Sequence, residues 1–293
     1  MNATTILSSA KTTLKIEPDG PVMPIGERCN ALGYKSVRAA VGRGDFTIFS
    51  RRAAAQQAAG AQILNVNVVA EGVNEVEALP QAVRVMSEVA ACPLSIDFAN
   101  PKALQAALKV YPGRALINSV NGERAKMDAV FPVMKEFGAA AIALLVDTGE
   151  GIAMSAEKRV EIAERILAEA GRYGLGVDDF IFDCVVLGAC TEPLSARVTF
   201  ETMRRLRERL GGNITLGSTN AAFGLPARET FNAHFLSTAL AFGCNVPITD
   251  PTIPELKQAL VIGDVLRGVD EYAINYIRHF RATALTVPKV SAA

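Results

Sequence analysis

AAIALLVD, residues 140–147, is the stretch of sequence that best indicates the fold. Seven apolar residues in a row, followed by a carboxylate, are typical of a strand buried on both faces of a parallel sheet. A half-exposed antiparallel strand would alternate apolar and polar residues instead. The segment that follows, at about 155–172, has the amphipathic pattern of a helix. These two segments are therefore predicted to form one strand–helix unit of an α/β protein.

The same unit recurs along the whole chain. The predicted strands are Val22–Ile25, Gln62–Val68, Leu94–Ile96, Ala115–Ile117, Ala140–Val146, Phe180–Phe182, Ile214–Leu216 and Asn245–Ile248. The predicted helices lie at about 46–59, 75–90, 101–110, 123–137, 155–172, 196–210, 228–242 and 254–268. Eight strands that are each followed by a helix predict a single (β/α)8 TIM barrel. A doubly wound parallel sheet is the alternative, but no glycine-rich nucleotide-binding fingerprint follows the first strand.

The barrel is expected to occupy most of the chain. We assign residues 21–280 to it, residues 1–20 to an N-terminal extension and residues 281–293 to a C-terminal tail. A length of 293 residues fits one such domain.

Composition and charge exclude several classes of protein. Apolar residues make up 50% and charged residues 20% of the chain, which excludes a disordered or fibrous protein. The 30 basic and 30 acidic residues balance, so there is no charge signature for nucleic acid or an anionic membrane. The sequence has neither the roughly 18 consecutive apolar residues of a membrane span nor a signal-peptide pattern. We therefore expect a cytoplasmic protein.

Cysteine and histidine usage bears on metals and disulfides. Five cysteines, an odd number without a CxxC pair, indicate a reducing compartment and no disulfides. Two histidines cannot build a His-rich metal centre. A zinc site formed by Cys184, Cys190 and Cys244 is an alternative, but isolated cysteines are more often core residues. We predict no bound metal.

Polar residues follow each predicted strand. They are Glu27, Asn65, Asn67, Asp97, Asn100, Asn118, Asp147, Asp183, Asn220 and Asp250. A single Asp or Asn at such a position can be a turn or cap residue, but the carboxyl ends of barrel strands converge on one rim, where barrel enzymes carry their chemistry. No Lys ends a strand, which disfavours Schiff-base chemistry, and no GxSxG or phosphate-binding loop is present. A ring of carboxylates and amides suits a flat, nitrogen-rich heterocycle, because a carboxylate binds an amidine edge through two hydrogen bonds.

Several motifs at these strand ends, in the same order and at matching spacing, resemble those of the pterin-binding methyltransferases. The motifs are IGERCN (25–30), SIDFAN (95–100), ALINSVN (115–121), FIFD (180–183), LGSTN (216–220) and FGLPAR (223–228). The family includes methyltetrahydrofolate:corrinoid/iron-sulfur protein methyltransferases and the folate module of cobalamin-dependent methionine synthase. The resemblance extends over about residues 22–280 and implies a barrel like that of dihydropteroate synthase.

The resemblance implies roles for individual residues. Asp97, Asn118 and Asp183 would hold the pterin through its amino-pyrimidinone edge and ring nitrogens. Asn220 would lie near N5, the nitrogen that carries the methyl group, and act in catalysis by accepting a hydrogen bond from protonated N5. The other residues expected in the pterin pocket are Glu27, Asn67, Asn100 and Arg228.

The resemblance also implies a reaction and a partner. The reaction would move a methyl group between N5 of (methyl)tetrahydrofolate and the cobalt of a corrinoid such as cobalamin. The chain lacks the Asp-x-His-x-x-Gly motif expected of a cobalamin-binding module, so the corrinoid is expected on a separate protein that docks on the C-terminal rim of the barrel. The family further implies a homodimer.

Three departures from the family pattern keep alternatives open. Asn65 stands where Asp is usual, Phe98 where small polar residues are common, and Cys184 where Pro is usual. A non-catalytic pterin-binding subunit is one alternative, and Asn65 and Phe98 speak for it. A dihydropteroate synthase-like enzyme is another, although the chain lacks that enzyme's seventh-strand Lys and its Ser/Thr-Arg-Pro-Gly loop.

Overall fold

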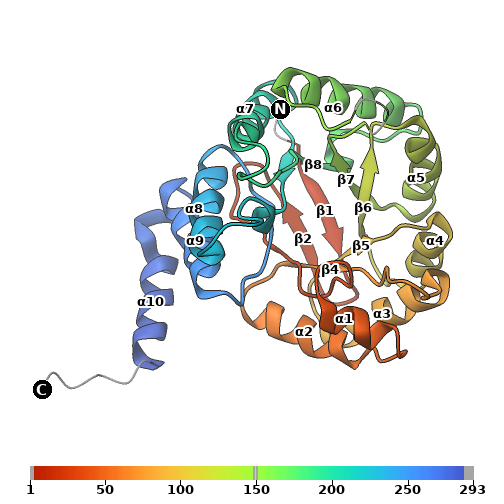
Figure 1. The fold of residues 1–293 in the computed structure, drawn as a ribbon, viewed down its shortest axis with the longest axis horizontal. Helices are drawn as coiled ribbons and strands as arrows, with labels where there is room; N and C mark the ends of the chain where they lie inside the picture. Colours follow the sequence, from red (N-terminus) through yellow and green to blue (C-terminus); the bar gives the residue numbers. More distant parts are fainter. Residues whose placement is uncertain (1–2, 148, 150, 287–293) are drawn as a thin grey trace, which may run out of the picture.

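The computed structural model describes residues 3–147, 149 and 151–286, and shows a ring of helices around eight parallel strands (Figure 1). The strands are β3 (Ile25–Gly26), β4 (Ile63–Val66), β5 (Leu94–Asp97), β6 (Leu116–Asn121), β7 (Ala140–Leu144), β8 (Phe180–Asp183), β9 (Asn213–Thr215) and β10 (Ile248–Thr249). Their order in the sheet is β10-β3-β4-β5-β6-β7-β8-β9. The amide of Ile248 donates to the carbonyl of Leu216 at 2.9 Å and closes the ring. The predicted TIM barrel is confirmed.

The helices alternate with the strands. They are α1 (Lys35–Val41), α2 (Thr47–Ala58), α3 (Glu75–Val89), α4 (Pro101–Val110), α5 (Arg124–Phe137), α6 (Ala156–Gly171), α7 (Ser195–Arg209), α8 (Arg228–Ala241), α9 (Pro254–Leu266) and α10 (Ile274–Thr286). The helices α2–α9 match the eight predicted segments, whereas α1 and α10 were not predicted. The predicted C-terminal tail, residues 281–293, begins inside α10, and this helix extends away from the barrel (Figure 1). Residues 287–293 of the tail lie outside the described residues.

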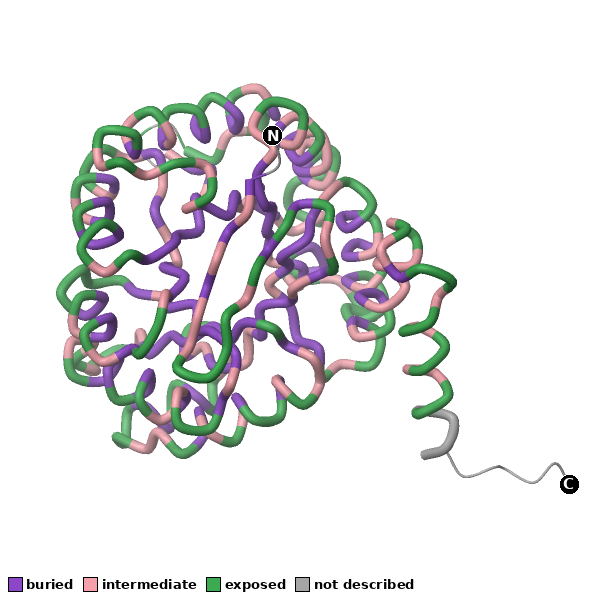
Figure 2. Tube along the Cα trace, turned by 180° about the vertical axis from the view of Figure 1, so that it is seen from behind, coloured by how far each residue is buried: buried purple, intermediate pink, exposed green. Residues whose placement is uncertain are grey.

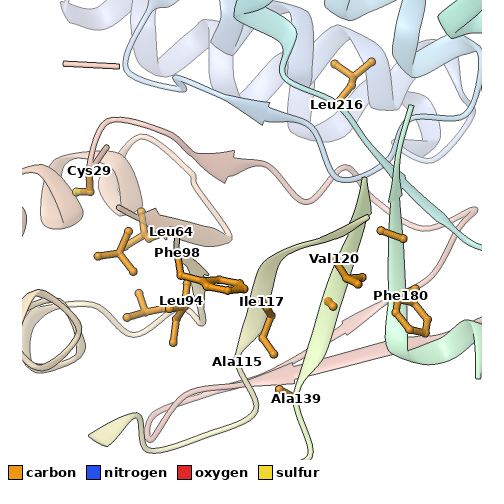
Figure 3. Packing of buried hydrophobic residues seen from close by; sticks show 14 of the residues in the cluster. Cys29, Leu64, Leu94, Phe98, Ala115, Ile117, Val120, Ala139, Phe180 and Leu216 are labelled. Carbon is orange, nitrogen blue, oxygen red and sulfur yellow. The ribbon is translucent and has the colours of Figure 1, made fainter. Parts of the chain in front are cut away.

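Two apolar layers stabilise the barrel, which explains why its strands are apolar on both faces. Inside the barrel, Ile25, Ile63, Leu116 and Ile181 pack together and are fully buried. A larger cluster fills the space between the strands and the helices, and Figure 3 shows part of it. Burial of these side chains supplies the main favourable free energy of folding.

The N-terminal extension forms an antiparallel hairpin of β1 (Thr5–Ser8) and β2 (Thr13–Ile16). The hairpin crosses one end of the barrel (Figure 2), where Leu7 and Ile16 are fully buried against the inner layer. Asn213 in β9 donates from Nδ2 to Thr5 Oγ1 at 3.0 Å and to the Ile16 carbonyl at 3.1 Å. The amino end of the barrel is therefore covered, and the polar strand ends lie at the opposite end. None of the described helices combines the length and apolar character needed to cross a bilayer.

Candidate active site

Polar side chains from three adjacent strands are linked at the carboxyl end of the barrel. Asp97 ends β5 and lies in register with Asn118 in β6. Asn65 in β4 connects the two, since its Nδ2 donates to Asp97 Oδ2 at 3.4 Å and its Oδ1 accepts from Asn118 Nδ2 at 3.2 Å. Asn65, one of the departures from the family pattern, is thus part of the site. An aspartate at this position would place a second negative charge beside Asp97.

Burial shapes the chemistry of Asp97. It raises the pKa of this carboxyl to about 6, and the amides of Asn67 and Asn65 oppose the rise. The amide of Asn67 lies near enough to Asp97 to lower the pKa of its carboxyl group. Its Nδ2 atom nevertheless makes no hydrogen bond of ordinary geometry with any described residue. The buried hydroxyls of Ser95 and Thr215 are also without a hydrogen-bond partner in the described part of the chain. Unpaired buried polar atoms are costly, so these three positions, which lie after β4, in β5 and in β9, suit a polar ligand that would pair with them.

Asp183 ends β8, on the far side of β7 from Asn118. Its Oδ1 accepts from the amide of Val185 at 2.8 Å. Burial raises the pKa of the carboxyl to about 6, and the nearby Arg159 opposes this rise. A carboxyl group with this pKa is mostly ionised at neutral pH and can accept two N–H bonds from a ligand.

Arg159 fixes the loop that follows Asp183. Its side chain comes from α6 and is completely buried. Nη1 donates to the carbonyls of Cys184 at 2.5 Å and Val185 at 3.0 Å. Val185 has φ 60°, a conformation that is strained for a β-branched residue. Arg159 therefore holds a strained loop in place beside the carboxylate.

Asn220 lies at the edge of an open cavity at the same end of the barrel. It belongs to a short 3-10 helix, η2 (Ser218–Asn220), directly after β9. The cavity has a volume of about 560 Å³, within the range of small-molecule sites, and Glu27, Thr219 and Arg228 also line it. A Cβ atom added to Gly217 would lie 2.7 Å from Asn220 Nδ2, so the asparagine amide folds back over the glycine.

Glu27 follows β3 and accepts two hydroxyl hydrogen bonds in the same cavity. Tyr34 Oη donates to Oε1 at 3.3 Å, and Thr219 Oγ1 donates to Oε2 at 3.1 Å. Burial raises the pKa of Glu27 to about 7; the nearby Asp250 adds to the rise, whereas the two hydroxyls and Arg28 oppose it. Asp250 is buried and forms a salt bridge of 2.6 Å with Arg28.

The remaining predicted residues fall into two groups. Arg228 begins α8, lines the cavity and donates from Nη2 to the carbonyl of Thr219 at 3.4 Å. Asn100 instead caps α4, where its Oδ1 accepts from the amide of Lys102 at 2.9 Å. The structure thus brings Glu27, Asn220 and Arg228 around one cavity, and gives Asn100 a capping contact.

Sequence reasoning missed several residues of the site. Arg28 and Thr219 lie within the quoted motifs IGERCN and LGSTN, so the motifs themselves carried the signal. Tyr34 and Arg159 had no such signal, because their contacts depend on packing between distant segments.

The other two departures from the family pattern lie outside the polar cluster. Phe98 is buried beside Leu94 and Ile117 in the outer apolar layer (Figure 3). Cys184 and Cys244 are fully buried and Cys190 is exposed. The described residues include no group of three His, Cys, Asp or Glu side chains that could hold a metal ion.

Comparison with known proteins identifies the family. The family described as pterin binding enzyme matches residues 26–250. The methylcorrinoid:tetrahydrofolate methyltransferase of Eubacterium limosum is 30% identical over 262 residues, which cover 88% of this chain and 95% of that protein. The methionine synthase of Mycobacterium tuberculosis is 33% identical over 246 residues, but these span 20% of its length.

Solved structures agree on the fold. Yersinia pestis DHPS with a pterine-sulfa conjugate superimposes with a TM-score of 0.66, at 14% identity, over 90% of this chain and 100% of that one. At this identity the likeness concerns the barrel alone. With a family match that covers most of its length and a relative that it matches nearly end to end, the chain belongs to the family of pterin-binding enzymes.

Proposed function

We propose that this protein transfers a methyl group between N5 of (methyl)tetrahydrofolate and the cobalt of a corrinoid carried by a separate protein. The observation that carries the proposal is the half-buried cluster of the Asp97 carboxyl group with the Asn65 and Asn118 amides at the open end of the barrel, together with the unpaired Nδ2 of Asn67. The similarity of nearly the whole chain to a methylcorrinoid:tetrahydrofolate methyltransferase supports this choice of reaction.

Pterin recognition would use the half-buried carboxyl groups of Asp97 and Asp183. Asp97 and Asp183 would accept N–H bonds from the amino-pyrimidinone edge, and such bonds stabilise the ionised form that burial disfavours. Asn118 would contact the ring nitrogens. The unpaired Nδ2 of Asn67 would gain an acceptor in the same cluster.

The methyl step would be a displacement at carbon. The C–N5 bond breaks with its electron pair on N5, N5 takes a proton, and the methyl group is transferred to the reduced cobalt of the partner's corrinoid. Asn220 can accept a hydrogen bond from protonated N5, a contact that strengthens toward the transition state. The reverse transfer would use the same contacts.

The rim of the barrel supports docking of the corrinoid protein. Leu32, Leu194 and Phe223, in loops that follow β3, β8 and β9, are 57%, 61% and 65% exposed. Leu32 and Phe223 also line the cavity, and exposed apolar side chains of this size in loops at one end of a barrel are typical of a protein contact surface. A homodimer and a cytoplasmic location are further parts of this proposal and rest on the family resemblance and the composition.

A spectroscopic assay tests the reaction. Purified protein mixed with 5-methyltetrahydrofolate and cob(I)alamin should convert the cob(I)alamin spectrum to that of methylcobalamin, and the reverse mixture should regenerate 5-methyltetrahydrofolate. A non-catalytic subunit would bind folate without changing the spectrum. A dihydropteroate synthase-like enzyme would instead form dihydropteroate from its own substrates.

A further inference from the structure

Glu27 is placed to exchange a proton with a ligand in the cavity. It lines the same cavity as Asn220, and both of its oxygens accept hydrogen bonds from hydroxyl groups, from Tyr34 at 3.3 Å and from Thr219 at 3.1 Å. A hydroxyl can donate to a carboxylate and accept from a carboxylic acid, so these contacts suit both protonation states of Glu27.

Burial and the negative charge of Asp250 favour the protonated form of Glu27. The positive charge of Arg28 is paired with Asp250 in a salt bridge of 2.6 Å. Asp250 also accepts a hydrogen bond from the Thr252 hydroxyl at 2.6 Å. Burial raises the pKa of Glu27 to about 7, and the negative charge of Asp250 adds to the rise against the opposing effects of Thr219, Tyr34 and Arg28. Burial also raises the pKa of Tyr34, which therefore stays protonated.

Other charged groups border this part of the cavity. The guanidinium of Arg52, from α2, lies 5.0 Å from the Tyr34 ring centroid and donates to the carbonyl of Arg28. Arg228 and Glu229, at the start of α8, are the other charged residues that line the cavity in the described part of the chain.

The proposed reaction needs an acid that Asn220 cannot provide. N5 is a poor leaving group unless it is protonated as the C–N5 bond breaks, and an amide has no proton to give at neutral pH. Asp97 and Asp183 are assigned to the pterin edge as hydrogen-bond acceptors. A carboxyl with a pKa near the working pH is the most effective general acid, and Glu27 meets this condition.

We propose that Glu27 is the acid of the site, an inference that rests on the proposed methyl transfer. In the step, the O–H bond of the Glu27 carboxyl breaks and an N–H bond forms at N5, which keeps the electron pair of the broken C–N5 bond. The methyl group passes to the reduced cobalt of the partner's corrinoid, and Glu27 is left as a carboxylate held by Tyr34 and Thr219. In the reverse reaction Glu27 takes the proton back.

A pH profile of single-turnover transfer from 5-methyltetrahydrofolate to cob(I)alamin tests this role. The wild-type rate should fall as pH rises through about 7, because the acid form is lost. Glu27→Gln should be about 100-fold slower at pH 6 and lose this pH dependence, while folate affinity changes little. Glu27→Asp should restore part of both. Glu136→Gln, which removes an exposed carboxyl group on α5 outside the cavity, is the matched control and should keep the wild-type profile.

The outcomes separate this inference from the proposed function. An active wild type together with a Glu27→Gln variant that keeps the normal rate and pH profile would overturn the acid role alone. A wild type that transfers no methyl group would overturn the proposed function and this role with it. Infrared difference spectra between pH 6 and pH 9 add a readout without turnover. Asp97 and Asp183 also titrate in this range, so wild type should show one protonated carboxyl band more than Glu27→Gln, and equal spectra would refute the protonation that the role requires.

Discussion

A methyl group added at Gly217 should reduce the rate of methyl transfer while leaving the fold intact. The backbone of Gly217 has φ −79° and ψ 95°, which alanine adopts without strain. The new Cβ would lie 2.7 Å from Asn220 Nδ2, whereas ordinary contact begins at 3.4 Å, so the amide must move by about 3.4 − 2.7 = 0.7 Å. Because Nδ2 is the end of a flexible side chain, the asparagine moves and the barrel does not.

The size of the effect follows from this displacement. Misplacing a reacting group by 1 Å costs about 100-fold in rate, and losing one preorganised electrostatic contact costs about 2.7–4 kcal/mol. A shift of the Asn220 amide by about 0.7 Å should therefore raise the activation free energy of methyl transfer by about 2 kcal/mol, which slows the reaction roughly thirtyfold.

Single-turnover transfer at saturating 5-methyltetrahydrofolate measures this loss, and thermal unfolding and folate titration check the fold and the pocket. Gly171→Ala is the matched control, since its Cβ would have no neighbour within 4 Å. Adding Asn220→Ala to Gly217→Ala should cost less than Asn220→Ala alone, because both changes remove the same contact. A Gly217→Ala variant with the normal rate would refute the assignment of Asn220.

Three further predictions concern the buried charges. Asp183→Asn should weaken folate binding at least tenfold, because two charge-assisted hydrogen bonds are lost, and should leave thermal unfolding nearly unchanged. Tight folate binding by the folded variant, measured by titration, would contradict the pterin role of Asp183. Arg159→Met should lower the free energy of unfolding by about 2–4 kcal/mol in denaturant titrations, because the carbonyls of Cys184 and Val185 lose their donor. It should also raise the pKa of Asp183, because the positive charge beside this carboxyl group is removed. Unchanged stability would show that the loop does not depend on Arg159. The folded-state pKa of Asp97 and Asp183, about 6, lies above the ordinary 3.8, so the stability contributed by their protonated forms is complete below pH about 4 and lost as pH rises through 6. Folate binding needs the carboxylates, so the folate-induced rise in Tm should grow between pH 5 and pH 7, and a rise that is independent of pH would argue against both residues as ligands.

Local patterns in the sequence were enough to predict the barrel. Apolar runs such as 140–146 indicate strands buried on both faces, and this burial is a property of the strand itself. The positions of polar residues at strand ends followed from the topology, so Asp97 and Asn118 could be expected side by side. Asn100 was assigned to the pocket on the same reasoning, but sequence alone does not distinguish a pocket amide from a helix cap.

Contacts between distant segments could not be predicted in this way. Glu27 and Thr219 are 192 residues apart in the chain, and their hydrogen bond exists only because the barrel closes. Arg159 reads as one more charged residue in an amphipathic helix, yet it is buried against the loop after β8. The N-terminal hairpin has short strands with exposed positions, so no long apolar run marked it.

The docked hairpin imposes an order on folding during synthesis. Thr5 leaves the ribosome before its hydrogen-bond partner Asn213, which is 208 residues further along the chain. At about 5–20 residues per second, this partner is synthesised about 10–40 s later. During that interval Leu7 and Ile16 have no barrel to bury them, and they are exposed to chaperones and to other nascent chains. The hairpin, although translated before the strands of the barrel, is thus among the last segments to reach its native contacts.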